Sequence, residues 1–196
     1  MAAADALLAK LRGAIAAMAP ALRVDLVVVS DHGMAAVDRT VDLGKVVPKR
    51  GFFPYLAVSG PLCNLYVRGE AQRGEVARAL KKLPPEISVY ASGTLPPALA
   101  YPPSPRTGDF VLLCPPGETF RGYRSRTERA PPRGMHGYAP SAQDMGGIFF
   151  AEGPRIKAGA RIAAVQAQDV APTLCDLLGI PPPPHADGHS LAPSLR

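Results

Sequence analysis

Residues 24–34 read VDLVVVSDHGM, and this stretch decides the fold class. The valine run does not alternate with polar residues, which is typical of a strand buried on both faces of a parallel sheet. Asp31 and His32 follow this strand at its carboxyl end, where open α/β sheets place their ligand sites. Gly33 permits the tight chain reversal that directs both side chains into one cleft. The stretch therefore predicts an α/β fold with a site at the end of this strand.

The spacing of apolar residues on either side of this stretch predicts further helices and strands. Leucine, isoleucine and methionine recur along residues 3–18 at helical spacings, which predicts an amphipathic helix that ends by Pro20. Further strands are expected at residues 62–67, 87–90, 109–114 and 147–151, and further helices at residues 74–83 and 168–178. Residues 115–145 are rich in proline, glycine and arginine with little periodicity. We expect them to form a long irregular loop over the site.

The composition is that of a soluble globular protein. The chain has 196 residues, of which 47% are hydrophobic and 19% charged, so it is long enough for one domain and too short for two ordinary ones. Its net charge of +6 is spread over many positions. The densest arginine stretch lacks aromatic interleaving and helical spacing, so no nucleic-acid-binding motif is indicated. Two interpretations of these arginines stay open, attraction of a phosphate-bearing substrate and a solvated loop.

The cysteines and the N-terminal residues exclude further classes of protein. Cys63, Cys114 and Cys175 are odd in number and widely spaced, which indicates buried thiols and neither a disulfide framework nor a cysteine zinc site. Asp5 and Lys10 interrupt the apolar pattern of the first twenty residues. We therefore expect neither a signal peptide nor a membrane span there, and the compartment stays open.

A second candidate site residue, His136, lies between two glycines in the sequence GMHGY, residues 134–138. Imidazole and carboxylate both bind transition metals, and glycine lets the backbone approach a metal or an anion closely. Each motif also has an ordinary structural interpretation. Asp31 could cap a turn beside a hydrogen-bonded His32, and His136 could be an exposed histidine on a flexible segment.

Four blocks of sequence together resemble the nucleotide pyrophosphatase/phosphodiesterases of the alkaline phosphatase superfamily. The blocks are VVVSDHGM (27–34), GMHGY (134–138), DMGGIFFAEGP (144–154) and DVAPTLCDLLGI (169–180). This resemblance implies an α/β fold, an alkaline-phosphatase-like three-layer sandwich with a mixed, mostly parallel sheet. It also implies a hydrolase of phosphodiester or pyrophosphate bonds in nucleotides or related small-molecule esters, with two zinc ions (Zn2+) acting as Lewis acids.

The resemblance implies metal ligands at three positions. Asp31 and His32 match the pair that binds the zinc on the side of the nucleophile, and His136 matches the last histidine of the other zinc. In that family the threonine nucleophile and three further ligands precede the SDHGM block. Residues 1–30 contain neither histidine nor threonine. We therefore expect no catalytic nucleophile in this chain, poor zinc binding and no activity of the chain alone.

The same comparison implies that residues 1–196 are the C-terminal portion of a single catalytic domain whose sheet is incomplete on its N-terminal side. A missing N-terminal half would be one partner. The chain departs from the family at Ala139, where an aspartate is usual. His185 and His189 are expected to be surface residues. Two alternatives stay open, a non-catalytic remnant or interaction domain, and another hydrolase of the superfamily such as a sulfatase.

Overall fold

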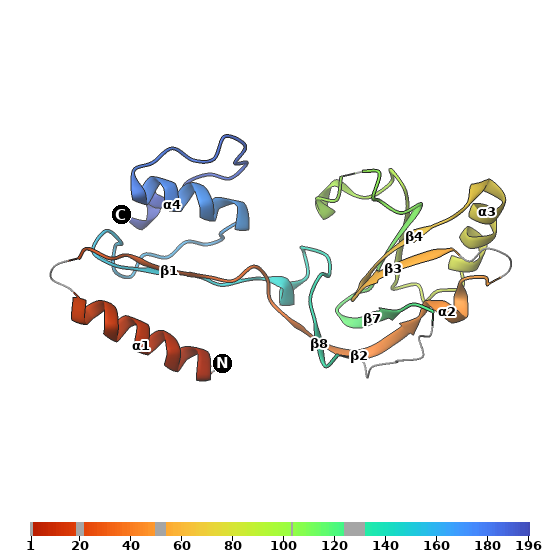
Figure 1. Cartoon of the computed structure of the whole chain (residues 1–196), viewed down its shortest axis with the longest axis horizontal. Coiled ribbons are helices and arrows are strands. Elements are labelled where there is room, and N and C mark those ends of the chain that lie inside the picture. The colour runs from red at the N-terminus through yellow and green to blue at the C-terminus, as the bar shows by residue number, and fades with distance from the viewer. Residues whose placement is uncertain (1, 19–21, 50–53, 103, 124–131) are drawn as a thin grey trace. The chain divides into compact units, whose positions relative to one another are not determined.

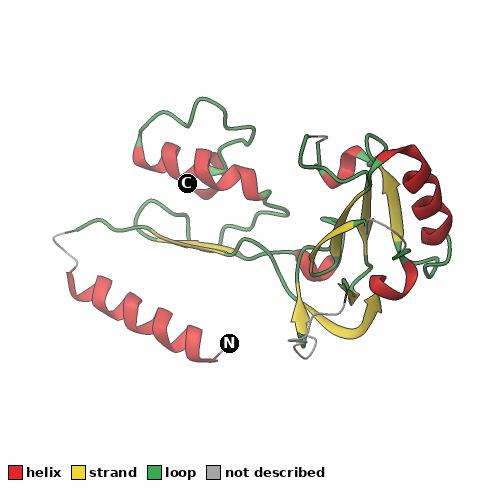
Figure 2. Ribbon diagram, turned by 45° about the vertical axis from the view of Figure 1, so that its right-hand side comes forward, coloured by secondary structure: helices red, strands yellow, loops and turns green. Residues whose placement is uncertain are grey.

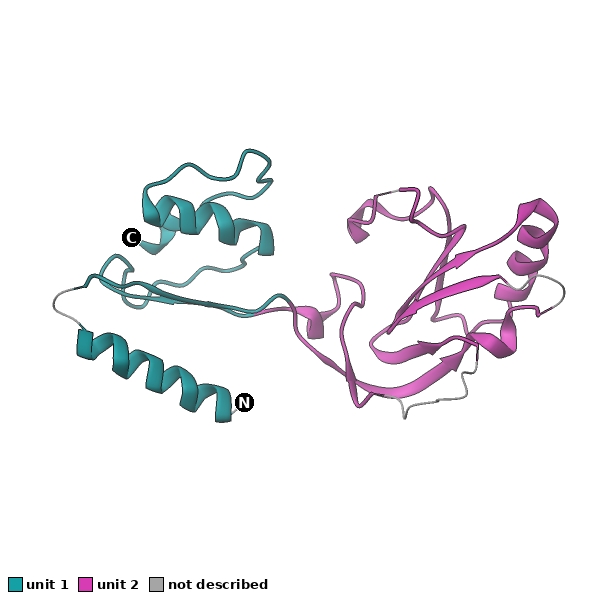
Figure 3. Ribbon diagram, in the orientation of Figure 1, with its two compact units in different colours: residues 1–31, 148–196 teal, residues 32–147 magenta. Residues whose placement is uncertain are grey.

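The computed structural model describes residues 2–18, 22–49, 54–102, 104–123 and 132–196. The chain divides into two compact units, shown in two colours in Figure 3. Unit 1 comprises Met1–Asp31 and Ile148–Arg196, and unit 2 comprises His32–Gly147. That both units belong to one catalytic domain stays a prediction.

Unit 2 is built around an antiparallel sheet with strand order β3-β4-β6-β5 (Figure 1). Its strands are β3 (Tyr55–Ser59), β4 (Leu62–Tyr66), β5 (Ser88–Ala91) and β6 (Phe110–Leu113). All four residues of β6 are buried, as expected for an inner strand, and β4 alternates, with Cys63 and Leu65 fully buried. Helix α3 (Gly69–Leu80) runs beside this sheet (Figure 2). Its residues Val76 and Leu80 belong to the same core.

A second sheet of unit 2 has the order β7-β2-β8. Strand β2 (Ala35–Asp42) pairs in parallel with β7 (Gly117–Arg121) and antiparallel with β8 (Gly134–Met135). Arg39 on β2 forms ion pairs with Glu118 on β7 and with Glu86. The short helices α2 (Leu43–Val46) and η1 (Pro97–Leu99) complete the regular structure, together with η2 (Gln143–Met145).

Unit 1 contains a two-stranded antiparallel ribbon, β1 (Leu26–Val29) paired with β9 (Phe149–Glu152). The other elements of unit 1 are α1 (Ala2–Met18), η3 (Ala167–Asp169), α4 (Val170–Leu178) and α5 (Ala192–Leu195). The expectation that β1 is buried on both faces of a parallel sheet was wrong. Its partner is antiparallel, its residues are half-buried, and Val29 is exposed. Helix α1 has no buried residue, and its Arg12 forms an ion pair of 2.5 Å with Glu152 of β9.

Asp25 fixes the start of β1 within unit 1. Its carboxylate accepts hydrogen bonds from the backbone nitrogen of Arg155 at 3.1 Å and from its Nε at 2.5 Å. Arg155 also donates a hydrogen bond from a terminal guanidinium nitrogen to the carbonyl oxygen of Leu177, 2.7 Å away on α4. Gly153 has a positive φ of 146°, and a Cβ there would lie 2.3 Å from Oδ1 of Asp25. The glycine of the AEGP sequence is therefore required by this contact.

The predicted loop over residues 115–145 is a loop only in part, because β7, β8 and η2 lie within it. Residues 124–131, which include three of the clustered arginines, lie outside the described residues. Cys63 and Cys114 are buried free thiols, as expected, whereas Cys175, which was also expected to be buried, is partly exposed. In the part of the chain that the structure describes, no helix has both the length and the apolar character needed to cross a membrane.

Candidate functional site

The structure brings the imidazoles of His32 and His136 together in unit 2. Their ring centroids are 3.8 Å apart and the ring planes differ by 11°. Strand pairing explains this contact, because Ala35 of β2 lies opposite Met135 of β8. His32 precedes β2 and His136 directly follows β8, so the antiparallel register places the two histidines at the same end of the pair.

The tautomer of His32 follows from a hydrogen bond to the backbone. Its Nδ1 lies 2.7 Å from the carbonyl oxygen of Gly33, and a carbonyl can only accept, so Nδ1 carries the proton. The lone pair of the neutral ring is then on Nε2. Metal-binding histidines are commonly oriented in this way, with one ring nitrogen donating to a carbonyl and the other available to a metal.

Gly33 joins two of the sequence blocks that suggested the site. Its backbone nitrogen donates a hydrogen bond to the carbonyl oxygen of Met145 at 3.0 Å. A Cβ at this position would lie 2.1 Å from the carbonyl oxygen of Asp144. Only glycine allows the SDHGM turn to approach residues 144–146 this closely. The DMGG sequence therefore supports the position of His32 through its backbone.

Asp31, the third predicted ligand, is exposed and is the last residue of the first segment of unit 1. Two hydrogen bonds join the preceding Ser30 to Ile148. The nitrogen of Ser30 donates to the carbonyl oxygen of Ile148 at 3.1 Å, and the nitrogen of Ile148 donates to the hydroxyl of Ser30 at 2.9 Å. Among residues with described positions, no group of three or more His, Cys, Asp or Glu side chains is arranged to hold a metal ion. Since a catalytic zinc normally has three protein ligands, the two histidines by themselves do not make up a zinc site.

His185 and His189 are exposed, as the sequence predicted. The backbone of His189 nevertheless has a structural role, because its nitrogen donates to Oδ1 of Asp169 at 3.0 Å, while the nitrogen of Gln166 donates to Oδ2 at 3.1 Å. These two hydrogen bonds lower the pKa of Asp169. The hydroxyl of Thr173 accepts a hydrogen bond from the nitrogen of Leu191 at 2.9 Å. Asp169 and Thr173 of the DVAPT block therefore fasten the C-terminal segment to η3 and α4, a role that the sequence did not reveal.

Sequence reasoning also missed a small cavity in unit 2 whose lining includes the residues that follow His136 in the chain. It measures about 130 Å³ and is lined by Gly137, Tyr138 and Ala139, which directly follow the histidine, and by apolar side chains of β4, β6 and residues 95–101. Ala139, the position at which the chain departs from the family pattern, is half-buried in this lining. The only signal in the sequence was this apolar residue directly after GMHGY.

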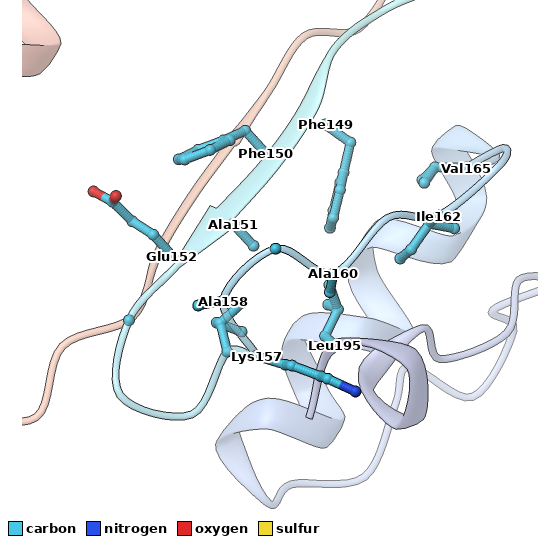
Figure 4. Close-up of a pocket in the computed structure, with 13 residues that line it drawn as sticks. Phe149, Phe150, Ala151, Glu152, Lys157, Ala158, Ala160, Ile162, Val165 and Leu195 are labelled. Atoms are coloured by element: carbon cyan, nitrogen blue, oxygen red, sulfur yellow. The ribbon is translucent and has the colours of Figure 1, made fainter.

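A larger cavity, of about 400 Å³, lies in unit 1 beside β9 (Figure 4). Phe149, Ile162, Val165 and Leu195 line it together with Lys157. None of the three predicted metal ligands belongs to its lining.

Comparisons with known proteins identify relatives of this chain. The model of the family described as "Type I phosphodiesterase / nucleotide pyrophosphatase" matches residues 1–139. Human ectonucleotide pyrophosphatase/phosphodiesterase family member 7 is 31% identical over 183 residues, which are 89% of this chain and 39% of that protein. The mouse bis(5'-adenosyl)-triphosphatase of the same family is 27% identical over 166 residues, covering 83% of this chain and 34% of the relative.

Solved structures show the same likeness in three dimensions. Human ectonucleotide pyrophosphatase/phosphodiesterase 5 superposes with a TM-score of 0.74 at 25% identity over 88% of this chain and 45% of that one. An inactive variant of the murine protein in complex with AMP gives a TM-score of 0.75 at 26% identity, with the same coverage. These structures confirm the predicted α/β, alkaline-phosphatase-like fold. The chain spans less than half the length of these relatives. It belongs to the type I phosphodiesterase/nucleotide pyrophosphatase family.

Proposed function

We propose that this chain supplies part of the site of a metal-dependent hydrolase that cleaves phosphodiester or pyrophosphate bonds in nucleotides or related esters. The observation that carries the proposal is the face-to-face contact of His32 and His136, which come from separate family blocks 104 positions apart in the chain. Family membership supports the reaction class. The murine structural relative with AMP, and the relatives named as triphosphatases, support a nucleotide as substrate.

In this proposal the three predicted ligands have separate roles. His32 and His136 offer imidazole nitrogens, and Asp31 adds a carboxylate next to His32 in the chain. Bound zinc ions would supply Lewis acidity toward phosphoryl oxygens. The residues of this chain would hold and orient the ions, and the hydrogen bond from Nδ1 of His32 to Gly33 would fix one ring.

The nucleophile is proposed to come from outside these residues. The family pattern places a threonine before the SDHGM block, and residues 1–30 contain no threonine. An incomplete ligand set also limits metal affinity, because each missing ligand leaves a position to water. We therefore propose that the chain alone binds zinc weakly and does not turn over substrate.

Zinc titration of the purified chain tests the metal site directly. Calorimetry of the parent chain, His32→Ala, His136→Ala and the control His185→Ala is expected to show weaker binding for the first two variants, by at least about tenfold. His185 is exposed in the C-terminal segment, so its replacement removes an imidazole without touching the site. Equal zinc affinities for all four proteins would contradict the assignment of His32 and His136.

A second candidate function, as an interaction domain, is favoured by the apolar surface of the β1–β9 ribbon. Phe150 and the nearby Ile148 are exposed by 49% and 62%, and Val29, which pairs with Phe149 and so lies on the opposite face from Phe150, is exposed by 46%. Exposed apolar side chains beside an unpaired strand edge are features of protein-binding surfaces. This candidate predicts association in solution and no loss of fold when the histidines are replaced.

A further inference from the structure

An apolar groove lies in unit 2 between helix α3 and the strands β5 and β6, and its volume is about 360 Å³. On one side it is lined by Ala77, Leu80 and Lys81, whose i, i+3 and i+4 spacing places them on one face of the helix and its C-cap. On the other side it is lined by Val89 of β5 and Phe110 of β6, which share one face of the sheet. Phe110 is buried, whereas Val89 is 37% exposed. The groove therefore has a core residue on its floor and an open margin at β5.

Strand β5 has a free backbone edge at this margin. It is the last strand in the order β3-β4-β6-β5, and within the described residues it pairs only with β6. The nitrogen of Ser92 donates to the carbonyl oxygen of Asp109, 2.9 Å away toward β6. Val89 lies an odd number of residues before Ser92, so antiparallel alternation directs its N–H and C=O away from β6. Residues 88–91 contain neither a charged side chain nor a proline, which commonly protect such an edge.

Positive charge lies at one end of the groove. Lys81 and Lys82 are exposed, and neither forms an ion pair with another of the described residues. Lys81 and Ile87 line the same groove, and Ile87 directly precedes β5, so this positive end lies at the start of the strand. The neighbouring carboxylate of Glu86 is already paired with Arg39. The two ammonium groups are therefore available to an acidic partner.

We propose that this groove binds an extended, acidic segment of a partner protein, which adds to the free edge of β5 as a further strand. Its backbone would bond to that of Val89, and its alternate apolar side chains would enter the groove. Antiparallel pairs are the commoner kind, and in an antiparallel arrangement the carboxyl end of the segment lies at the start of β5, near Lys81. The matching segment has apolar residues at alternate positions and acidic residues at its carboxyl end. This binding requires neither zinc nor the hydrolytic site.

Fluorescence anisotropy of the full chain with a labelled synthetic peptide tests the proposal. The probe alternates valine and threonine and ends in glutamates. Because Val89 faces the groove and the free edge, the peptide residues that bond to it are those with side chains in the groove, the valines. N-methylation of the valine nitrogens is therefore expected to abolish binding, and N-methylation of the threonine nitrogens to change affinity by less than about threefold. Lysines in place of the glutamates are expected to weaken binding at least about tenfold.

Matched variants of the chain locate the peptide. Ala77→Leu fills the groove from α3 and is expected to weaken binding at least about tenfold, whereas Ala71→Leu, at an exposed position of α3 outside the lining, is the control. Lys81→Glu is expected to weaken binding of the glutamate peptide, and Lys10→Glu, at an exposed position of α1, is expected to leave it unchanged. Thermal unfolding establishes that each variant is folded.

Equal affinities of the two N-methylated peptides would overturn pairing at β5. Equal affinities of folded Ala77→Leu and Ala71→Leu would exclude the groove, and no binding of the glutamate peptide to the folded parent chain would overturn the proposal as a whole. Sedimentation of the chain without peptide tests the other occupant. Self-association that Ala77→Leu abolishes and Ala71→Leu does not would identify a second copy of the chain in the groove and contradict the peptide assignment.

Discussion

At the scale of single residues, the stacked histidines make metal binding sensitive to acid. Protons compete with metal ions for imidazole nitrogens, and two charged rings 3.8 Å apart would repel each other. We expect the zinc affinity of the chain to fall at least about tenfold between about pH 7.5 and about pH 5.5. Competition with a chelating dye at each pH measures this. An affinity that stays constant or rises on acidification would exclude the histidines as ligands.

The cysteines differ in reactivity because they differ in burial. Burial raises the pKa of the Cys63 thiol to about 12. The pKa of the Cys114 thiol is also raised to about 12, mainly by burial and to a smaller extent by the nearby Glu118 carboxylate. The thiolate is the reactive form, so both thiols stay protonated and unreactive at mildly alkaline pH. Cys175 is partly exposed. A disulfide reagent at about pH 8 is expected to modify Cys175 fast and the other two only on unfolding. A fast phase that persists in Cys175→Ser would be incompatible with this burial.

At the scale of elements, Asp169 stabilises the junction of η3, α4 and the C-terminal segment. Its folded-state pKa is lowered by hydrogen bonds from the nitrogens of His189 and then Gln166. A carboxylate with a lowered folded-state pKa stabilises the fold fully at pH values above its ordinary pKa of 3.8. This stabilisation is lost as the pH falls from 3.8 through the folded-state pKa. Asp169→Asn should therefore lower the Tm of the chain at neutral pH and have little effect at about pH 2.

The matched control for this prediction is Asp187→Asn, a replacement of an exposed aspartate in the same C-terminal segment. Thermal unfolding of the parent and both variants across the acid range gives the comparison. If the Tm of Asp169→Asn fell further below that of the parent chain as the pH is lowered, the result would contradict this prediction.

The β1–β9 ribbon is the element most prone to self-association. Within the described residues each of its strands pairs only with the other, and a two-stranded sheet is marginally stable alone. Because Phe150 is 49% exposed on β9, Phe150→Lys should reduce concentration-dependent association in sedimentation experiments. Leu178→Lys, at a 63% exposed position on α4, serves as the control. Equal effects of both substitutions would indicate nonspecific hydrophobic association instead of pairing at the ribbon.

Local periodicity predicted the elements whose apolar pattern is strong. Residues 3–18 form α1 and residues 168–178 contain α4, and the strands expected near 62–67 and 109–114 are β4 and β6. Strand β2 was missed because its sequence, AAVDRTVD, has little apolar character and is stabilised by its neighbours β7 and β8. The antiparallel partner of β1 could not be predicted, since a valine run does not specify which strand pairs with it.

For the candidate site, the sequence identified candidate residues and not their geometry. His32 and His136 were named from motifs, but their ring contact depends on the register of β2 and β8, which no local pattern gives. The small cavity in unit 2 combines residues from four separate stretches of the chain. Its existence depends on how these stretches pack, so only the structure could show it.

At the scale of the whole molecule, the chain is a family member that spans less than half the length of its relatives and brings together His32 and His136, the two imidazoles that we propose as metal ligands. Its two units carry separate features, the histidine pair in unit 2 and the apolar ribbon in unit 1.

Hydrolysis of a nitrophenyl phosphodiester by the purified 196-residue chain, with zinc added and its zinc content measured, tests the central claim most directly. We expect less than one zinc ion per chain and no turnover above the uncatalysed rate. Stoichiometric zinc with turnover that His136→Ala abolishes would contradict it, because the chain would then contain a complete site and its own nucleophile.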